Sequence, residues 1–377
     1  MKNKIIDIVK AILYKIFCLL PIKNNKIVCC NFHVKAYGDN PKYIVNELLK
    51  QKKDYDIVWI CQSKYNKTVP DGVRICNGGL KLLYEYATAH VWISNVRLPR
   101  ILNKRKGQFY IQTWHGGLGL KKCEKDVLHT LSPDYIKTID KDSKMTDLAV
   151  SNSKFLTDLY ARAMDYHGEI IEYGLPRNDN LIKNSIDYGY LKKQLNIKTD
   201  KVLLYAPTFR DNYRISAYNI DMIQLINTLE NVTNNEWSIL VKFHPNVINT
   251  DKIVNFNEKV INVSDYGDIN ELFNICDLLI TDYSSCMFDY MLLNRLVFLY
   301  TPDIDDFIKE RNFMIDIYSL PFPIANNNQE LFSNIKKYFN KDIKDKYDIF
   351  NKLHGLHETG KSAIEIVKVI NKVIKGD

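Results

Sequence analysis

Short runs of β-branched and aromatic residues alternate along the chain with longer stretches whose apolar positions recur at helical spacing. In the first half, the runs that predict strands cover residues 26–30, 57–60, 91–94, 108–113 and 148–150. Helical patterns between or after them cover residues 41–50, 80–89 and 153–163. Strands that alternate with helices in this way indicate a parallel sheet covered by helices.

A second series of the same kind follows the loop at residues 174–178 and a polar helical stretch at 188–195. Its predicted strands are residues 202–205, 239–242, 260–263, 278–280 and 296–299, and its predicted helices are residues 221–230, 269–275 and 285–293. We therefore predict an α/β protein with two Rossmann-like, doubly wound parallel-sheet domains in tandem. The domains would cover residues 23–180 and 181–377, the second ending in a closing helix at 362–374.

The first 22 residues predict a separate amphipathic helix. One helical face carries the apolar side chains of Ile5, Ile8, Val9, Ile12, Ile16 and Leu19. Lys10 lies on the opposite face, and Lys10 and Lys15 interrupt the apolar segment, which argues against a membrane span or a signal peptide. Two interpretations stay open: a basic helix bound to an anionic membrane surface, or a helix packed on the protein itself.

Composition narrows the class of partner. The 377 residues contain 52 Lys and Arg against 44 Asp and Glu, a net charge of +8 that favours anionic partners but is low for a nucleic-acid-binding protein. Eight cysteines without a CxxC pair predict neither a zinc framework nor a disulfide scaffold, and they indicate a reducing, cytosolic location. His354, His357 and Glu358 lack a further ligand set, so no metal site is predicted.

Ligands of doubly wound sheets bind beyond the carboxyl ends of the strands, so the residues after each strand are the candidates for chemistry. The strand at 108–113 runs into Trp114 and His115 and then the sequence GGLGLKK. Histidine is the side chain most readily used as a base at neutral pH, and a glycine such as Gly116 permits close approach of a ligand. Lys121 and Lys122 suit an acceptor or its phosphate. A structural histidine is the alternative.

Two clusters in the second series follow strands in the same way. The sequence YAPTFRD, residues 205–211, places Arg210 just past a strand, where its planar fork of donors could clamp a phosphate. The sequence FHPN, residues 243–246, places His244 directly after the next strand. A surface arginine and a capping or core histidine are the corresponding structural interpretations.

A fourth cluster, the turn TDYSS, combines several donors where a buried strand meets a helix. The residues concerned are Thr281, Asp282, Ser284 and Ser285. Hydroxyls, free backbone N–H groups and the positive end of a helix dipole together suit a diphosphate. The structural alternative is an ordinary helix N-cap, which stabilises a helix by about 1 kcal/mol.

Taken together, the four clusters resemble the CDP-glycerol glycerophosphotransferase family, the primases and polymerases that build teichoic acids and related phosphopolyol polymers. The resemblance also includes the sequences YGDNPKYI at residues 37–44 and HETGK at 357–361. It implies a GT-B fold, in which two Rossmann-like domains face each other across a cleft and the second mainly holds the nucleotide donor.

The resemblance also implies roles for individual residues. His115 would deprotonate an acceptor hydroxyl, while His244, Ser284 and Ser285 would bind the donor diphosphate. On physical grounds we add Arg210 as a phosphate clamp and Asp282 as the residue that orders the turn. The family commonly reads HGTPLK where this chain reads HGGLGLK, which leaves the acceptor open.

The implied reaction is attack by an acceptor hydroxyl on the β-phosphorus of CDP-glycerol or CDP-ribitol, with release of CMP and with no cofactor beyond this donor. The acceptor would be a glycan or a polyprenyl-linked molecule at the cytoplasmic face of the cell membrane, where the enzyme would be peripheral. Two alternatives remain: a GT-B glycosyltransferase that uses a nucleotide sugar, and a catalytically silent polymer- or membrane-binding protein that keeps the fold.

Overall fold

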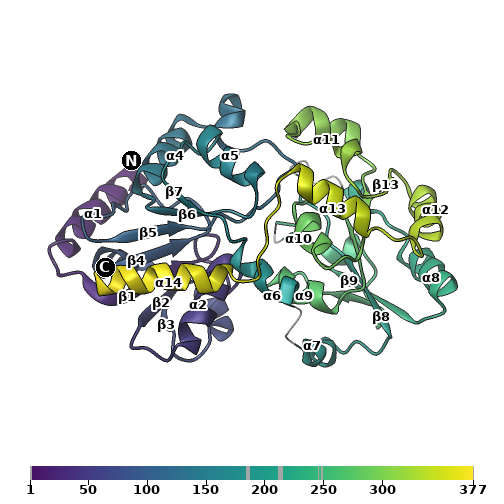
Figure 1. Ribbon diagram of the computed structural model, residues 1–377, viewed down its shortest axis with the longest axis horizontal. Coiled ribbons are helices and arrows are strands. Elements are labelled where there is room, and N and C mark those ends of the chain that lie inside the picture. The colour runs from purple at the N-terminus through teal and green to yellow at the C-terminus, as the bar shows by residue number, and fades with distance from the viewer. Residues whose placement is uncertain (1, 184–186, 211–214, 245, 248, 377) are drawn as a thin grey trace. The chain divides into compact units, whose positions relative to one another are not determined.

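The computed structural model describes residues 2–183, 187–210, 215–244, 246–247 and 249–376 (Figure 1). The chain divides into two compact units. Unit 1 comprises Met1–Gly117, Cys123–Asp179 and Gly355–Asp377, and unit 2 comprises Leu118–Lys122 and Asn180–His354. Each unit is built on its own parallel sheet, so the predicted α/β class with two parallel-sheet domains is confirmed.

Unit 1 contains a seven-stranded parallel sheet in the order β3-β2-β1-β4-β5-β6-β7. Its strands are β1 (Lys23–Cys30), β2 (Asp56–Ile60), β3 (Arg74–Cys76), β4 (Ala89–Ser94), β5 (Phe109–Gln112), β6 (Leu148–Val150) and β7 (Glu169–Ile171). The five predicted strands of this half are all present. Strands β3 and β7 were not predicted. They lie at the two edges of the sheet and have three residues each, too few for a pattern of alternation to be visible.

The helices of unit 1 are α1 (Lys2–Phe17), α2 (Asp39–Lys50), α3 (Gly79–Thr88), α4 (Pro133–Met145), α5 (Lys154–Arg162) and α14 (Ser362–Lys375). Short 3-10 turns include η1 (Ser63–Thr68), η2 (Glu124–Thr130) and η3 (Pro176–Asn178). Polar residues cap two of the helices, because the Ser132 and Ser153 side chains accept hydrogen bonds from backbone N–H groups of α4 and α5.

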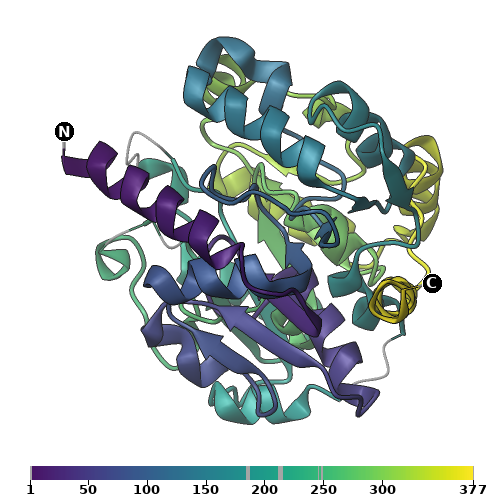
Figure 2. The same ribbon diagram turned by 90° about the vertical axis from the view of Figure 1, so that its left-hand side faces the viewer.

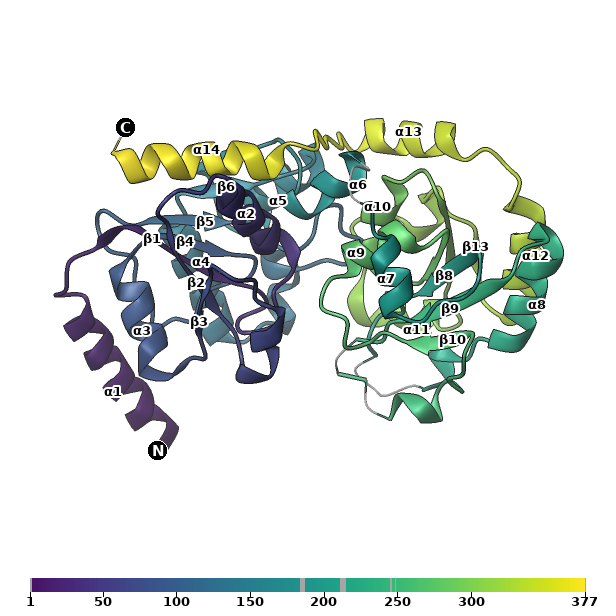
Figure 3. The ribbon, with the colours of Figure 1, turned by 90° about the horizontal axis from the view of Figure 1, so that it is seen from below.

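The prediction that the C-terminal helix closes the second domain is wrong, because α14 belongs to unit 1 and lies beside α2 (Figure 3). Its apolar stripe, which includes Ile366 and Ile370, is fully buried there. The Asp179 carboxylate accepts hydrogen bonds from the N–H groups of Ser362 and Ala363 at 2.9 and 2.8 Å. These two N–H groups at the start of the helix have no partner within the helix itself. The chain therefore returns to unit 1 to bury this stripe.

Unit 2 contains a six-stranded parallel sheet in the order β10-β9-β8-β11-β12-β13. Its strands are β8 (Lys201–Tyr205), β9 (Trp237–Val241), β10 (Val260–Asn262), β11 (Leu278–Thr281), β12 (Leu296–Tyr300) and β13 (Ile324–Ala325). Its helices are α7 (Gly189–Gln194), α8 (Met222–Thr233), α9 (Ile269–Ile275), α10 (Cys286–Met291), α11 (Ile304–Arg311), α12 (Asn328–Tyr338) and α13 (Lys344–Leu353), with α6 (Asp179–Lys183) at the boundary between the units. The five predicted strands of this half are present, and the two-residue β13 was missed.

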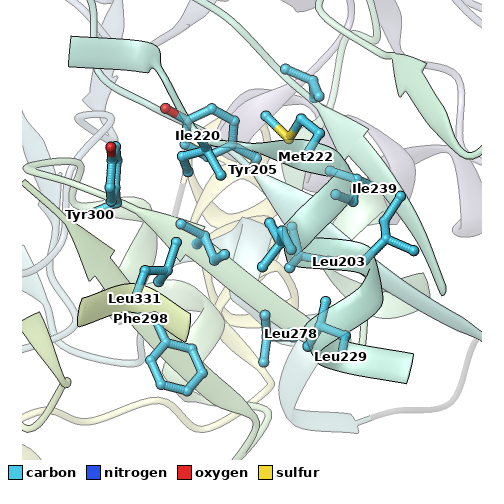
Figure 4. Packing of buried hydrophobic residues seen from close by; sticks show 14 of the residues in the cluster. Leu203, Tyr205, Ile220, Met222, Leu229, Ile239, Leu278, Phe298, Tyr300 and Leu331 are labelled. Carbon is cyan, nitrogen blue, oxygen red and sulfur yellow. The ribbon is translucent and has the colours of Figure 1, made fainter. Parts of the chain in front are cut away.

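Apolar side chains from the strands of unit 2 pack against α8 and α12 (Figure 4). Leu203, Ile239 and Leu278 come from three adjacent strands, and they meet Leu229 of α8 and Leu331 of α12. All five side chains are buried with no exposed surface. This core holds the sheet rigid, and the carboxyl ends of its strands carry the candidate donor residues.

Helix α1 presents apolar side chains in two directions. The helix lies beside α3 (Figure 2). Tyr14 is 2% exposed and donates a hydrogen bond to Asn103 O at 2.7 Å, and Phe17 packs edge-on against Tyr84 of α3. The predicted face points elsewhere: Ile8, Val9, Ile12, Ile16 and Leu19 are between 48 and 84% exposed. The side chain of Ile5 lies outside the described residues. The helix thus packs on the protein through one face and leaves the predicted apolar face exposed.

Among the described residues, no helix has the combination of length and apolarity needed to cross a bilayer.

Candidate active site

His115 lies directly after β5, and its ring is held by one short hydrogen bond. The Nδ1 atom is 2.8 Å from the backbone oxygen of Asn95, which follows β4. A carbonyl oxygen only accepts hydrogen bonds, so Nδ1 carries the proton and Nε2 of the neutral ring has its lone pair available. The ring also lies against Phe32 and Trp114, with centroid distances of 5.2 and 4.4 Å.

The surroundings of His115 favour its neutral form. Burial lowers the pKa of the imidazole below its ordinary value, because removal from water disfavours the charged ring. The hydrogen bond to Asn95 and the Asp39 carboxylate act in the opposite direction, and the Arg177 guanidinium lowers the pKa further. At neutral pH the ring is therefore mainly unprotonated, as a general base must be.

The two glycines after His115 meet different surroundings. A Cβ atom added to Gly117 would lie 2.5 Å from the amide nitrogen of Asn152, whereas one added to Gly116 would meet only the Trp114 ring at 3.7 Å. Asn152 cannot easily move, because its amide nitrogen donates to Glu358 Oε1 at 2.9 Å. Gly117 is therefore the glycine that close packing requires.

We expect Gly117→Ala to destabilise the protein by about 1–3 kcal/mol, the usual range for overpacking. In a unit of this size, each kcal/mol lowers Tm by about 2–4 °C. Gly116→Ala is the matched control and should leave Tm unchanged. Thermal unfolding followed by circular dichroism measures both variants, and equal Tm values for them would contradict the proposed contact with Asn152.

The two lysines of the first cluster belong to the other unit. Lys121 forms an isolated antiparallel bridge with Phe313, and its Nζ lies 5.0 Å from the centroid of the Phe307 ring. The backbone N–H of Lys122 donates to Asn312 O at 3.4 Å. His115 and Gly116 lie in unit 1 and both lysines lie in unit 2, so the predicted acceptor residues are divided between the two units.

In unit 2, a buried ion cluster joins the ends of β8, β11 and β12. Arg210 donates to Asp303 from Nε at 2.6 Å and from Nη2 at 3.1 Å, and its Nη1 is 2.9 Å from Asp282 Oδ2. The side chains of Arg210 and Asp282 are 4 and 2% exposed. Although burial opposes it, the hydrogen bond from Arg210 holds the pKa of Asp303 below its ordinary value. Arg210 is therefore engaged with two carboxylates in this structure.

Asp282 links the loop after β8 to the turn after β11. Its carboxylate accepts hydrogen bonds from the N–H of Thr208 at 2.9 Å, from the Thr208 hydroxyl at 2.6 Å and from the N–H of Tyr283 at 2.6 Å. These contacts set the conformation of both loops. Asp211, at the end of the YAPTFRD cluster, lies outside the described residues.

His244 follows β9 and is exposed. Its Nδ1 accepts a hydrogen bond from the N–H of Asn246 at 3.2 Å, and its ring centroid is 5.6 Å from that of Phe209. Because Nδ1 is the acceptor, Nε2 carries the proton in the neutral ring, the reverse of the arrangement in His115. Pro245 lies outside the described residues.

The TDYSS turn divides into a buried part and a more accessible part. Thr281 has no exposed surface, and its hydroxyl donates to Ala206 O at 2.6 Å. This hydroxyl therefore links the end of β11 to the end of β8. Ser284 and Ser285 are half-buried, and Ser284 Oγ accepts a hydrogen bond from the N–H of Cys286 at 3.4 Å. The predicted helix at 285–293 is shorter in the structure, because α10 ends at Met291.

Thr208, which binds Asp282, lies in the YAPTFRD cluster that was selected from the sequence. Two other residues that hold these sites in place were missed. Asn95 and Asp303 each follow a strand, and a search of every strand end would have included them. Their partners were not visible in the sequence, because each pairs with a residue at the end of a different strand. Among the described residues, no group of three or more His, Cys, Asp or Glu side chains is arranged to hold a metal ion.

A sequence profile described as CDP-Glycerol:Poly(glycerophosphate) glycerophosphotransferase matches residues 12–372. A teichoic acid poly(glycerol phosphate) polymerase of Staphylococcus epidermidis is 32% identical over 94% of this chain, which spans 51% of that relative, about half its length. A teichoic acid glycerol-phosphate transferase of Staphylococcus aureus is 32% identical, with 98% of this chain and 100% of that protein covered.

The fold agrees with this match. The solved structure of an H444N variant of the wall teichoic acid polymerase TagF superimposes with a TM-score of 0.86 and 30% identity, covering 99% of this chain and 96% of that chain. The sequence profile and the structural superposition each cover the two units, as the resemblance in the four clusters predicts. The chain therefore belongs to the CDP-glycerol:poly(glycerophosphate) glycerophosphotransferase family.

Proposed function

We propose that this chain transfers a polyol phosphate, glycerol phosphate or ribitol phosphate, from a CDP-polyol to a hydroxyl of an acceptor, with release of CMP. The observation that carries the proposal is the opposite hydrogen bonding of two histidines. In the neutral rings, Nε2 of His115 carries the lone pair, whereas Nε2 of His244 carries the proton. A transfer of this kind needs both: a base for the attacking hydroxyl and a donor for the diphosphate.

The proposed step conserves atoms and charge. The acceptor hydroxyl gives its proton to Nε2 of His115, and its oxygen forms a bond to the β-phosphorus of the donor. The bond between that phosphorus and the bridging oxygen breaks, and CMP leaves with this oxygen and the electron pair. Phosphoryl transfer asks for positioning and charge stabilisation more than for covalent chemistry by the protein.

We propose that the donor diphosphate is held by His244, Ser284 and Ser285, three polar residues that are not buried and that follow strands of unit 2. Arg210 has a different role in this proposal from the phosphate clamp expected from the sequence. Because its guanidinium already pairs with two carboxylates, we assign it to shaping the donor loops together with Asp282. Gly116, Lys121 and Lys122 stay in the proposal as acceptor-binding residues.

We further propose that the enzyme works at the cytoplasmic face of the cell membrane, on a glycan or polyprenyl-linked acceptor in the synthesis of a teichoic-acid-like or capsular polymer. The exposed apolar face of α1 and the net charge of +8 support binding to an anionic surface. The names of the similar proteins, which are teichoic acid enzymes, support the polymer class.

A double variant tests the membrane contact. Ile12 and Ile16 are one helical turn apart on α1 and 54 and 51% exposed, so replacing both by glutamine removes apolar surface without changing charge. We expect binding to phosphatidylglycerol vesicles to weaken about tenfold or more, because burial of an isoleucine side chain contributes about 1.5–3 kcal/mol.

The matched control replaces Ile349 and Leu353 of α13 by glutamine, a pair with the same spacing and 70 and 75% exposed. Vesicle sedimentation at several lipid concentrations compares the two double variants with the unaltered protein. Equal losses of binding in both, or no loss in Ile12→Gln/Ile16→Gln, would remove α1 from the proposal.

The catalytic proposal is tested by nucleotide release. Purified protein is incubated with CDP-glycerol, CDP-ribitol or a panel of nucleotide sugars, with a membrane extract as the source of acceptor, and the released nucleotide is quantified. CMP from a CDP-polyol supports the proposal and identifies the polyol. Nucleotide released only from a sugar donor would instead indicate a glycosyltransferase, and no turnover with any donor would favour a silent binding protein.

A further inference from the structure

Two sequence motifs without an assigned role meet at the turn that carries His115. They are the YGDNPKYI motif at residues 37–44 and the loop at 174–178. We propose that Asp39 and Arg177, one from each motif, are positioning residues for His115, which they hold in one orientation between two opposite charges. This inference rests on the proposed role of His115 as the base, and it concerns residues of unit 1 alone.

Arg177 contacts the backbone of His115 directly. Its Nη1 donates to His115 O at 2.8 Å and to the two carboxylate oxygens of Asp39 at 3.3 and 3.4 Å. The Arg177 side chain is 4% exposed and that of Asp39 is 15% exposed. A buried guanidinium needs a carboxylate to offset its loss of hydration, so Asp39 keeps Arg177 in the place from which it holds the turn.

Asn40 joins the same contacts from the backbone side. Its Nδ2 donates to Trp114 O at 2.9 Å, and its Oδ1 accepts from the N–H of Arg177 at 3.1 Å. The side chain has no exposed surface. Asn40 and Arg177, which belong to motifs distant in the sequence, therefore bind two consecutive carbonyl groups, those of Trp114 and His115.

The backbone conformation explains why the turn needs this support. Trp114 has φ of +49° and Asp39 has φ of +55°, in the left-handed region that non-glycine residues seldom adopt. Such conformations cost about 1–3 kcal/mol each and persist where surrounding contacts determine them. The hydrogen bonds to the carbonyl groups of Trp114 and His115 are contacts of this kind. They fix the backbone of the proposed base and of the residue before it.

The two side chains also act on the charge of His115 with opposite signs. The carboxylate of Asp39 raises the pKa of the ring, as does that of Glu124 in η2 to a smaller extent, whereas the guanidinium of Arg177 lowers it. Removal of Asp39 takes away one of the charges that raise the pKa of His115, and removal of Arg177 takes away the charge that lowers it. A purely structural role would not produce shifts of opposite direction in the two variants.

The test uses the full chain with Asp39→Asn and Arg177→Gln as single variants and Arg74→Gln as the matched control. Arg74 also pairs with carboxylates in unit 1, those of Asp56 and Glu85, but it has no hydrogen bond to the His115 turn. The pKa of His115 is measured by NMR titration of ¹³C-labelled histidine, assigned with His115→Asn. Unfolding curves, kcat and the KM for the CDP-polyol are measured for each variant.

We expect the pKa of His115 to fall in Asp39→Asn and to rise in Arg177→Gln, because each variant removes one of the two charges, and to stay unchanged in Arg74→Gln. We also expect kcat to fall about 10- to 100-fold in Asp39→Asn and in Arg177→Gln. The KM for the donor should stay within about threefold, because the proposed donor residues lie in unit 2. Arg177→Lys should retain the pKa of the unaltered protein, because it keeps the positive charge.

Shifts in the same direction, or no shift in either variant, would overturn the inference. If Arg177→Gln does not fold, the shift in Asp39→Asn and the retained pKa in Arg177→Lys decide it. The NMR titration needs no turnover, so the outcome is separate from that of the catalytic proposal. Opposite shifts in a protein that releases no CMP would support the placement of the ring and contradict its use as the base.

Discussion

Replacing His115 by alanine is expected to reduce CMP release from the CDP-polyol about 10²- to 10⁴-fold, the usual contribution of a general base. Without this base no group is positioned to take the proton of the acceptor hydroxyl in the transition state, so the loss acts on kcat. Donor binding should be preserved, because the proposed donor contacts of His244, Ser284 and Ser285 lie in unit 2. CMP release and equilibrium binding of the CDP-polyol measure the two effects separately.

Two further variants control for loss of structure. His115→Asn keeps a side-chain N–H that can donate to Asn95 O but has no basic nitrogen, so it should fold like the unaltered protein and be as inactive as His115→Ala. His90 makes the same kind of contact, from Nδ1 to Asn24 O at 3.0 Å, and His90→Ala should retain activity. Activity of His115→Asn within tenfold of the unaltered protein would show that another group accepts the proton.

Replacing Arg210 by methionine is expected to destabilise unit 2 by about 3–5 kcal/mol, the usual cost of removing one partner of a buried ion pair. The loss leaves two carboxylates, Asp282 and Asp303, without their cation, and their side chains are only 2 and 13% exposed. The loop after β8 and the turn after β11 both depend on Asp282, so CDP-polyol binding should also weaken. Urea unfolding at pH 7 followed by circular dichroism measures the change.

Lys259→Met is the matched control in the same unit, because Lys259 pairs with Glu230 at the surface, with side chains 43 and 29% exposed. Screening by water makes such pairs nearly neutral for stability. A free energy of unfolding for Arg210→Met within 1 kcal/mol of that for Lys259→Met would contradict a buried structural role. In that case the original interpretation of Arg210 as a phosphate clamp would be favoured.

The elements that bury most of their surface were predictable from local patterns. Apolar runs make up most of strands β8, β11 and β12, because both faces of a parallel sheet are covered. Strands β3, β7 and β13 were missed because two or three residues do not establish a period. The error in assigning α14 has a different cause: its apolar stripe predicts a buried helix but does not say which unit buries it.

The candidate residues were found through one topological rule. In a parallel sheet the carboxyl ends of the strands share an edge, so His115, His244 and Asp282 could be selected by position alone. The same rule covers Asn95 and Asp303, which follow β4 and β12, but neither residue type suggested a role without its partner. Position along the sequence therefore selects the edge, while the contacts at that edge distinguish a base from a clamp or a structural residue.

Local patterns in the sequence were enough to predict two parallel sheets and a histidine after a strand in each, because alternation, apolar runs and strand ends are local properties. Three features became visible only in the folded chain: which nitrogen of His115 and of His244 carries the proton, the pairing of Arg210 with Asp303 across 93 residues, and the pairing of Arg177 with Asp39 across 138 residues. These properties depend on hydrogen bonds and ion pairs between residues distant in the chain, and only folding brings such partners within bonding distance.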